Sequence, residues 1–338
     1  MKQVKVTGVR KAEVIDVPTP KPKENWVLVK VYSAPMCTEF KGFISGDGKQ
    51  GYGHEAAGEV IETAQPCRVK VGDRVVVQPG TPCGKCELCV SGEFIHCQNW
   101  YSFEKFTGGN TGLFTMAQYV LKQDWLLSPI PDDVSYDIAS MTICALGPTF
   151  GAFEMMKVDA FDTILITGLG PVGLGGIVNA KYRGAMVIGI ESHPYRTKLA
   201  KELGAEEVIS PSDPDALKKV MEFTKGRGID KAVDCSGAPA AHTFCLEAAC
   251  RKGHIAFVGQ CHEPSNFIVS KHMIQKGLTL HGAWHYNLAV YPRVLEVAKR
   301  SPVIKKLITH TFPIGKIQEA WELQCSGNCG KIILKPWE

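Results

Sequence analysis

Three glycines, Gly168, Gly170 and Gly173, form a G-x-G-x-x-G motif that leaves few folds open to this chain. The motif follows the apolar run Ile164–Thr167, which has the composition of a strand buried on both faces, and it opens a helical pattern over Pro171–Arg183. In this context the first glycine permits a tight turn and the second lets a pyrophosphate approach the backbone. The third lets the helix pack closely on the strand. The motif therefore indicates a dinucleotide-binding unit rather than an ordinary glycine turn.

The residues around this motif indicate which dinucleotide binds. Its phosphates would lie at the start of the helix, at Pro171 and Val172, where unpaired N–H groups and the helix dipole favour anions. Glu191 ends the next predicted strand, eighteen residues after the last glycine. Its carboxylate can accept hydrogen bonds from both ribose hydroxyls and would repel a 2′-phosphate, so NAD is expected rather than NADP. Two alternatives stay open: Glu191 as a solvated surface carboxylate, and Arg196 serving a 2′-phosphate.

Strand and helix patterns alternate through the middle of the chain, which predicts an α/β fold with a doubly wound parallel sheet. The further strands are expected at Met186–Ile190, Glu207–Ile209, Ala232–Cys235 and Ile255–Val258, and the further helices at Thr197–Leu203, Asp215–Thr224 and Ala241–Arg251. Before residue 150 the pattern is different. Short alternating runs at Val27–Val31, Gly58–Glu62 and Asp73–Gln78 predict an antiparallel, barrel-like β domain.

The rhythm of the parallel sheet is lost from about Gly282, so we expect the last stretch to rejoin the first domain. The predicted domains are 1–147, 148–281 and the return segment 282–338. A formal charge of +4 without a long basic run gives no support to nucleic-acid or membrane-surface binding. No signal peptide or transmembrane stretch is recognisable, so a cytoplasmic protein is expected.

Thirteen cysteines are many for such a protein, and four of them lie close together. Cys83, Cys86, Cys89 and Cys97 have the spacing C-x2-C-x2-C-x7-C, which lets one loop surround a tetrahedral Zn²⁺ with soft thiolate ligands. Because four protein ligands leave no open position, this zinc site should be structural. The alternatives are an iron–sulfur cluster, which the nearby cofactor domain makes unnecessary, and disulfides, which a reducing compartment disfavours.

A second, dispersed set of residues carries a resemblance to a known family. The set comprises Cys37, Gly53-His54-Glu55 with Gly58, the segment Cys83–Cys97 with its four cysteines (the cysteine lobe), the glycine motif, Gly282–Tyr286 with Tyr291-Pro292, and Ile308–Pro313. Over nearly its whole length the sequence resembles the medium-chain zinc-dependent alcohol and polyol dehydrogenases, the sorbitol and threonine dehydrogenase branch in particular. The resemblance implies a Rossmann domain joined to a β-rich, GroES-like catalytic domain with its zinc lobe at residues 80–100.

The resemblance also implies a catalytic Zn²⁺ held by Cys37, His54 and a third ligand, with Glu55 at or next to the metal. The third position falls on Cys144, which could instead be a small buried hydrophobic residue. Three protein ligands leave a position for the substrate hydroxyl, whose pKa zinc lowers. The alkoxide carbon then releases hydride to the nicotinamide.

The sequence departs from the family at Cys37-Thr38-Glu39-Phe40. Relatives carry a Ser or Thr that starts a proton relay, followed by an Asp that supports the ligand histidine. Here Glu39 and Phe40 take those two positions. Glu39 could accept the proton of the bound alcohol, bind a substrate hydroxyl or join the zinc ligands, and Thr38 could take over the relay. The group that orients His54 is not recognisable from the sequence.

These features predict an NAD- and zinc-dependent oxidoreductase acting on a secondary alcohol of a polyol, sugar or cyclitol-like substrate. The polar rings of His285 and Tyr286 are expected in the substrate pocket. A threonine-type amino-alcohol or simple alcohol dehydrogenase is the alternative, and a non-catalytic zinc protein is a further one. We also expect a homodimer or homotetramer, because relatives pair an edge strand at the position of Leu278–Trp284 across a two-fold axis. An internal strand at the end of the sheet is the other interpretation of that segment.

Overall fold

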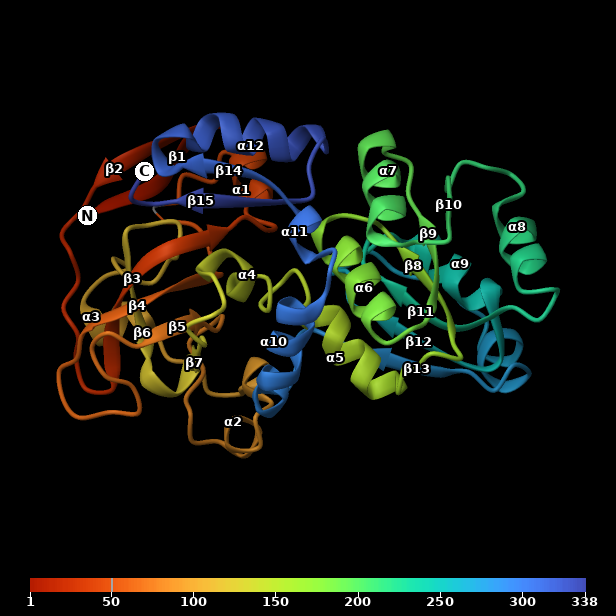
Figure 1. Ribbon diagram of the computed structural model, residues 1–338, viewed down its shortest axis with the longest axis horizontal. Coiled ribbons are helices and arrows are strands. Elements are labelled where there is room, and N and C mark those ends of the chain that lie inside the picture. Colours follow the sequence, from red (N-terminus) through yellow and green to blue (C-terminus); the bar gives the residue numbers. More distant parts are fainter. Residues whose placement is uncertain (50) are drawn as a thin grey trace. The chain divides into compact units, whose positions relative to one another are not determined.

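The computed structural model describes residues 1–49 and 51–338, which form two compact units (Figure 1). The first unit comprises 1–143, 287–299 and 308–338, and the second comprises 144–286 and 300–307. The chain thus leaves the second unit after Tyr286, returns to it for eight residues, and ends in the first unit.

The second unit contains a six-stranded parallel sheet with the strand order β10-β9-β8-β11-β12-β13. The strands are β8 (Thr163–Thr167), β9 (Met186–Ile190), β10 (Glu207–Ile209), β11 (Ile229–Asp234), β12 (Ala249–Phe257) and β13 (Thr279–Gly282). The helices that connect or flank them are α5 (Gly147–Met156), α6 (Pro171–Tyr182), α7 (Pro194–Leu203), α8 (Ala216–Phe223), α9 (Pro239–Ala248) and α11 (Ile304–Leu307). Numbered from β8, this order is 3-2-1-4-5-6, that of the doubly wound dinucleotide fold, and the predicted fold class is confirmed.

Local chemistry explains where the elements of this unit begin and end. Helices α6, α7 and α9 each have proline in the first turn, where its missing N–H costs no hydrogen bond. The prediction that α9 continues to Arg251 was wrong, because it ends at Ala248 and β12 follows directly. The ammonium of Lys276 donates to the carbonyls of Leu246, Glu247 and Ala249 and so satisfies the helix end from outside the local sequence.

The first unit is rich in β-structure, as predicted. Its seven-stranded sheet has the order β14-β15-β3-β4-β5-β7, with β6 paired to β3, and a separate hairpin joins β1 to β2. The strands are β1 (Lys2–Gly8), β2 (Lys11–Asp16), β3 (Trp26–Pro35), β4 (Ala56–Glu62), β5 (Arg74–Val77), β6 (Tyr119–Gln123), β7 (Leu127–Pro129), β14 (Ile308–Pro313) and β15 (Lys331–Lys335). The helices are α1 (Phe40–Ser45), α2 (Glu87–Val90), α3 (Phe103–Thr107), α4 (Tyr136–Ser140), α10 (Tyr291–Arg300, whose last residue belongs to the second unit) and α12 (Ile317–Ser326).

The core of the first unit joins segments from both ends of the chain. Alternate residues of β3 and β5, such as Val29 and Val75, are buried together with Trp321 of α12. The Trp321 ring stacks on Phe43 of α1 at a centroid distance of 5.0 Å. In the part of the chain that the structure describes, no helix combines the length and apolar character needed to cross a bilayer.

Candidate active site

The four lobe cysteines meet in one cluster of the first unit. Their Sγ atoms all lie within 4.8 Å of one another, with separations of 3.5 Å for Cys86–Cys89, 3.9 Å for Cys86–Cys97 and 4.0 Å for Cys83–Cys89. Four thiolates about 2.3 Å from a tetrahedral zinc ion would lie roughly 3.8 Å apart, so the donor set fits that ion. A disulfide needs an S–S distance of about 2.05 Å, and none of the thirteen cysteines, all of which the structure describes, forms one.

Backbone N–H groups favour the thiolate form of Cys86 in this lobe, whereas burial raises the pKa of the Cys89 thiol. The N–H of Cys86 donates to the Sγ of Cys83, and those of Cys83 and Asn99 donate to the Sγ of Cys97, each at 3.3 Å. Backbone hydrogen bonding, that of Cys89 foremost, lowers the pKa of the Cys86 thiol to about 6. Because thiolates are the form that binds zinc, the loop is prepared for the ion.

Two strand ends bring the second set of candidate ligands together. Cys37 follows the end of β3, and His54-Glu55 precede the start of β4. Because β3 and β4 pair antiparallel, with Ser33 opposite Ala57, these ends lie at the same edge of the sheet. The candidate ligand atoms of Cys37, His54 and Glu55 lie within 4.8 Å of one another.

Gly53 is needed for this arrangement. It has φ = 95°, and a Cβ there would lie 2.6 Å from the backbone nitrogen of Met116. Only glycine therefore fits before His54 without a shift of the backbone.

Glu39 lies beside His54 and not in solvent. Its Oε1 is 2.6 Å from His54 Nδ1, its Oε2 accepts the N–H of Cys37 at 2.9 Å, and its side chain is 10% exposed. Burial of the imidazole lowers its pKa, but Glu39 and the Cys37 thiol outweigh this effect and raise the pKa of His54 well above its usual range. With Nδ1 held by a carboxylate, Nε2 is the nitrogen left to bind a metal.

The C-terminal part of the first unit supplies two groups that sequence reasoning missed. Lys331, the first residue of β15, places its ammonium 2.7 Å from Oε1 of Glu55, and both side chains are fully buried. Burial raises the pKa of Glu55 to about 7, while Lys331 acts in the opposite direction. Gln324 of α12 donates from Nε2 to the carbonyl of Cys37 at 2.6 Å. The only sequence signal was a lysine at the start of the apolar run Ile332–Leu334.

The two remaining candidates near this set are Thr38 and Cys144. Thr38 is exposed beside the buried Cys37. Cys144 is buried, and it opens the second unit directly after Ile143.

The glycine motif has the geometry expected of a phosphate loop. Gly168 has φ = 77°, and a Cβ there would lie 2.6 Å from the Cβ of Ser236. A Cβ at Gly173 would lie 2.1 Å from the carbonyl oxygen of Gly168, whereas one at Gly170 would meet no atom within 4 Å. The first and third glycines thus serve packing, and the second leaves open space at the start of α6, where Pro171 and Val172 form the first turn. That space suits a pyrophosphate.

Glu191 lies at this loop, directly after β9. Its Oε2 accepts the N–H of Leu169 at 2.9 Å, and its Oε1 accepts those of Ser192 and His193 at 2.8 and 2.9 Å. The carboxylate is therefore fixed at the carboxyl end of the strand, where a dinucleotide ribose binds in this fold. Arg196 is half-buried in the first turn of α7.

His285 and Tyr286 are buried in the second unit after β13. Their ring centroids lie 4.5 Å apart, and the backbone of His285 packs so closely on α5 that a Cβ at Gly151 would lie 2.2 Å from its carbonyl oxygen. The two predicted substrate residues thus lie together.

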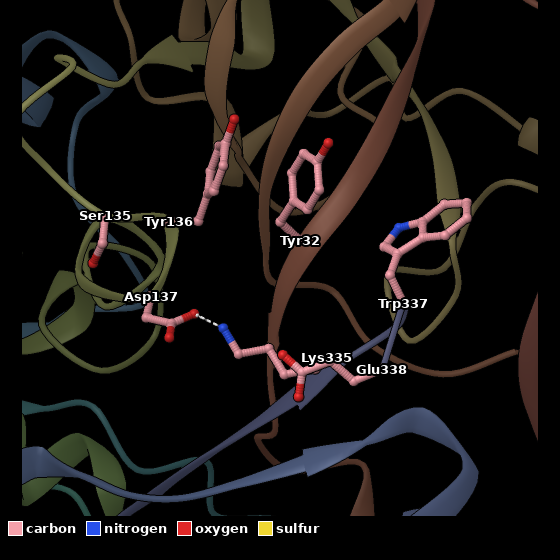
Figure 2. Close-up of a pocket in the computed structure, with 7 residues that line it drawn as sticks. All are labelled: Tyr32, Ser135, Tyr136, Asp137, Lys335, Trp337 and Glu338. Atoms are coloured by element: carbon pink, nitrogen blue, oxygen red, sulfur yellow. Dashed lines mark hydrogen bonds and ion pairs between the residues drawn. The ribbon is translucent and has the colours of Figure 1, made fainter.

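A cavity of about 260 Å³ lies elsewhere on the first unit (Figure 2). The lining residues include Tyr32, Tyr136 and Trp337, and its charged residues Asp137 and Lys335 form an ion pair at 2.5 Å. None of the predicted site residues lines this cavity, whose third charged lining residue is Glu338. We assign no role in the reaction to it.

Comparisons with known proteins agree with the site geometry. Residues 23–132 match the alcohol dehydrogenase GroES-like domain, and residues 171–300 match the zinc-binding dehydrogenase family. The chain is 33% identical to L-threonine 3-dehydrogenase of Pyrococcus abyssi, over 95% of this chain and 94% of the relative. It is 30% identical to sorbitol dehydrogenase of Bacillus subtilis, over 99% and 97%. A solved alcohol dehydrogenase from Escherichia coli CFT073, complexed with NADH, is similar with a TM-score of 0.86 and 25% identity, over 99% of each chain.

Proposed function

Because the chain belongs to the zinc-dependent medium-chain alcohol and polyol dehydrogenases, we propose that it oxidises a secondary alcohol of a polyol, sugar or cyclitol-like substrate with NAD. The observation that carries this proposal is the convergence of Cys37, His54 and Glu55 at one sheet edge. A simple structural role would not need a thiol, an imidazole and two carboxylates in that place.

Each residue has a distinct part in this proposal. Cys37, His54 and Cys144 would hold the catalytic zinc, and Glu55, which pairs with Lys331, would lie next to it. When bound, zinc makes the substrate hydroxyl more acidic. Glu39 is already engaged by His54 and by the Cys37 N–H, so we assign it to positioning and leave the proton relay to the exposed hydroxyl of Thr38.

In the second unit, Gly168, Gly170 and the first turn of α6 hold the pyrophosphate of NAD, and Glu191 holds the ribose. Tyr286 and His285 contact substrate hydroxyls. The many cysteines outside disulfides favour a reducing compartment, so we place the reaction in the cytoplasm, and we expect a homodimer or homotetramer.

A second candidate reaction is the oxidation of an amino alcohol. L-threonine 3-dehydrogenase of Pyrococcus abyssi is 33% identical to this chain over 95% of its length. The difference between the two reactions lies in the substrate pocket, since both use the same zinc and cofactor.

A panel of linear polyols, cyclitols, aldoses, L-threonine and simple alcohols, each with NAD, distinguishes these candidates. The measurement is kcat/KM from NADH formation by the zinc-loaded enzyme. The proposal expects the highest value for a polyol or cyclitol. A higher value for L-threonine would establish the second candidate, and the absence of NADH formation with every compound would indicate a non-catalytic protein.

A further inference from the structure

A buried carboxylate organises the carboxyl ends of two strands in the second unit. Asp234 is the last residue of β11 and is fully buried. It accepts hydrogen bonds from the hydroxyl of Thr167 at 2.7 Å, from the hydroxyl and N–H of Ser236 at 2.6 and 3.1 Å, and from the N–H of Gly237 at 2.9 Å. Thr167 directly precedes Gly168, and Ser236 is the residue against which Gly168 packs. The shape of the glycine loop therefore depends on Asp234.

His242 of α9 extends this network away from the glycine loop. Its Nε2 lies 3.1 Å from Oδ2 of Asp234, and its Nδ1 lies 2.6 Å from the hydroxyl of Ser265. A carboxylate only accepts, so a neutral His242 donates from Nε2 and accepts the Ser265 hydroxyl at Nδ1. His242 is 7% exposed, and its ring packs edge-on against Phe257 at a centroid distance of 4.9 Å.

Ser265 belongs to the segment that follows β12. Two contacts hold this segment, residues 259–268, to α9: the His242–Ser265 pair and the hydroxyl of Thr243, which donates to the Asn266 carbonyl at 3.2 Å. At its other end, the N–H of Gly259 donates to the carbonyl of Asp234, and a Cβ at Gly259 would lie 2.3 Å from the nitrogen of Gly237. The segment thus lies at the carboxyl ends of the parallel strands, where dinucleotides bind.

We propose that His242 and Ser265 are positioning residues for the NAD cofactor. They fix segment 259–268 beside the glycine loop, so that the dinucleotide meets a preformed crevice and does not have to order this segment on binding. Preorganisation of this kind raises affinity by removing the entropy cost of ordering. The proposal rests on NAD use by the enzyme, and it assigns to His242 and Ser265 no contact with the reacting atoms.

Two variants test the proposal. Ser265→Ala removes the His242–Ser265 contact and leaves the His242–Asp234 pair and the Thr243–Asn266 contact. His242→Phe removes both contacts of His242, to Ser265 and to Asp234, and keeps a ring against Phe257. We expect the Kd for NADH, measured by fluorescence titration, to rise by about tenfold in each variant, the scale of one lost hydrogen bond. The KM for NAD should rise by a similar factor. The kcat should stay within about twofold of the wild-type value, because the bound cofactor has the same geometry. Amide exchange in segment 259–268 should become faster in the cofactor-free variants.

Thr224→Ala is the matched control. Its hydroxyl donates to the carbonyl of Val220 and accepts the N–H of Gly228, at the amino end of β11 and so at the opposite edge of the sheet. This variant should lower the Tm and leave the Kd for NADH unchanged. If the Kd for NADH of Ser265→Ala and of folded His242→Phe stays within about twofold of the wild-type value, the two residues have a purely structural role and the proposal is overturned. Failure of the wild-type enzyme to bind NADH would instead contradict the cofactor assignment, and the proposal with it.

Discussion

At the scale of single residues, Glu39 combines two features that the family resemblance assigns to two positions. It stands where the resemblance implies a relay hydroxyl, yet its carboxylate contacts His54, the role implied for the next residue. The side chain is one methylene longer than aspartate, which lets it reach Nδ1 of His54 from one position earlier while also accepting the Cys37 N–H. Phe40, which replaces the aspartate, is then free to pack against the core of the first unit.

Replacing Glu39 with glutamine should weaken the binding of the catalytic zinc. The amide keeps the shape but loses the charge that stabilises His54 in its orientation, and loss of such a partner typically costs 10–100-fold in metal affinity or activity. We expect a fall in zinc affinity of roughly that size, measured by competition with a chromogenic chelator. Glu319→Gln, which removes an exposed carboxylate paired with Lys316, should leave zinc affinity unchanged. Normal zinc affinity combined with a large fall in kcat would show that Glu39 handles the proton instead.

Replacing Glu191 with alanine should improve the use of NADP. The carboxylate is fixed by the N–H of Leu169 at the glycine loop, so a 2′-phosphate entering there would meet a negative charge that does not move away easily. Removing a repulsion of about 1–3 kcal/mol should raise the NADP-to-NAD ratio of kcat/KM by roughly ten- to a hundredfold. The ratio is measured for both enzymes with one substrate. A wild-type enzyme that prefers NADP would contradict this assignment and would point to Arg196 as the residue that holds the phosphate.

At the scale of elements, the sequence predicted β8 to β12 and α6 to α9 of the second unit, because each of these carries its own period and end signals. The parallel strands are apolar runs, and glycine or proline stands at most helix ends. The end of α9 was predicted three residues too late, because it is set by Lys276, which lies 28 residues beyond Ala248 in the chain. Lys331 and Gln324 were missed for the same physical reason. Their roles depend on tertiary placement beside Glu55 and Cys37, and no local pattern encodes that placement.

A histidine pair joins β12 to β13 and should make the second unit sensitive to acid. Nδ1 of His254 lies 3.1 Å from Nε2 of His281, and the rings stack at 5.4 Å. Burial, and next the neighbouring His254, lower the pKa of His281 below its usual 6.5. As the pH falls through that value, the unfolded chain takes up the proton first, so stability should decrease until the folded pKa is reached.

Substitution of His281 by glutamine should therefore reduce the loss of Tm between about pH 7.5 and pH 5, by roughly 1–3 °C. The comparison is made by calorimetry at one protein concentration. His262→Gln, which changes an exposed histidine of the same unit, should leave the wild-type pH dependence intact. Parallel Tm-against-pH curves for wild type and His281→Gln would rule out this pair as the source of acid sensitivity.

At the scale of the whole molecule, the two candidate zinc sites differ in how open they are. The four thiols of the cysteine lobe fill all four coordination positions of one zinc ion. The set at Cys37 and His54 must leave one coordination position for the substrate. We expect two zinc ions per chain in protein never exposed to a chelator, one of which is removed more easily. Dialysis against a chelator should abolish activity before it changes the Tm or the circular dichroism spectrum. Metal analysis that finds one zinc or none would contradict the assignment, and simultaneous loss of fold and activity would indicate that the lobe zinc is the labile one.

The open edge of the parallel sheet is the feature that favours assembly of several chains. β13 is the last strand of the sheet, and its free edge presents backbone groups that can pair with another strand. The segment just before it carries exposed apolar side chains, Ile268 at 60% and Ile274 at 72%. We expect a symmetric dimer or tetramer in which β13 pairs with its counterpart across a two-fold axis. Ile274→Lys should shift the oligomer toward monomer at low micromolar concentration, as measured by light scattering, because it places a charge among the exposed apolar side chains that precede β13. Val9→Lys changes a side chain of similar exposure, 67%, in the first unit and should leave the mass unchanged. A wild-type mass equal to one chain at every concentration would leave β13 as the solvent-exposed edge of a monomer.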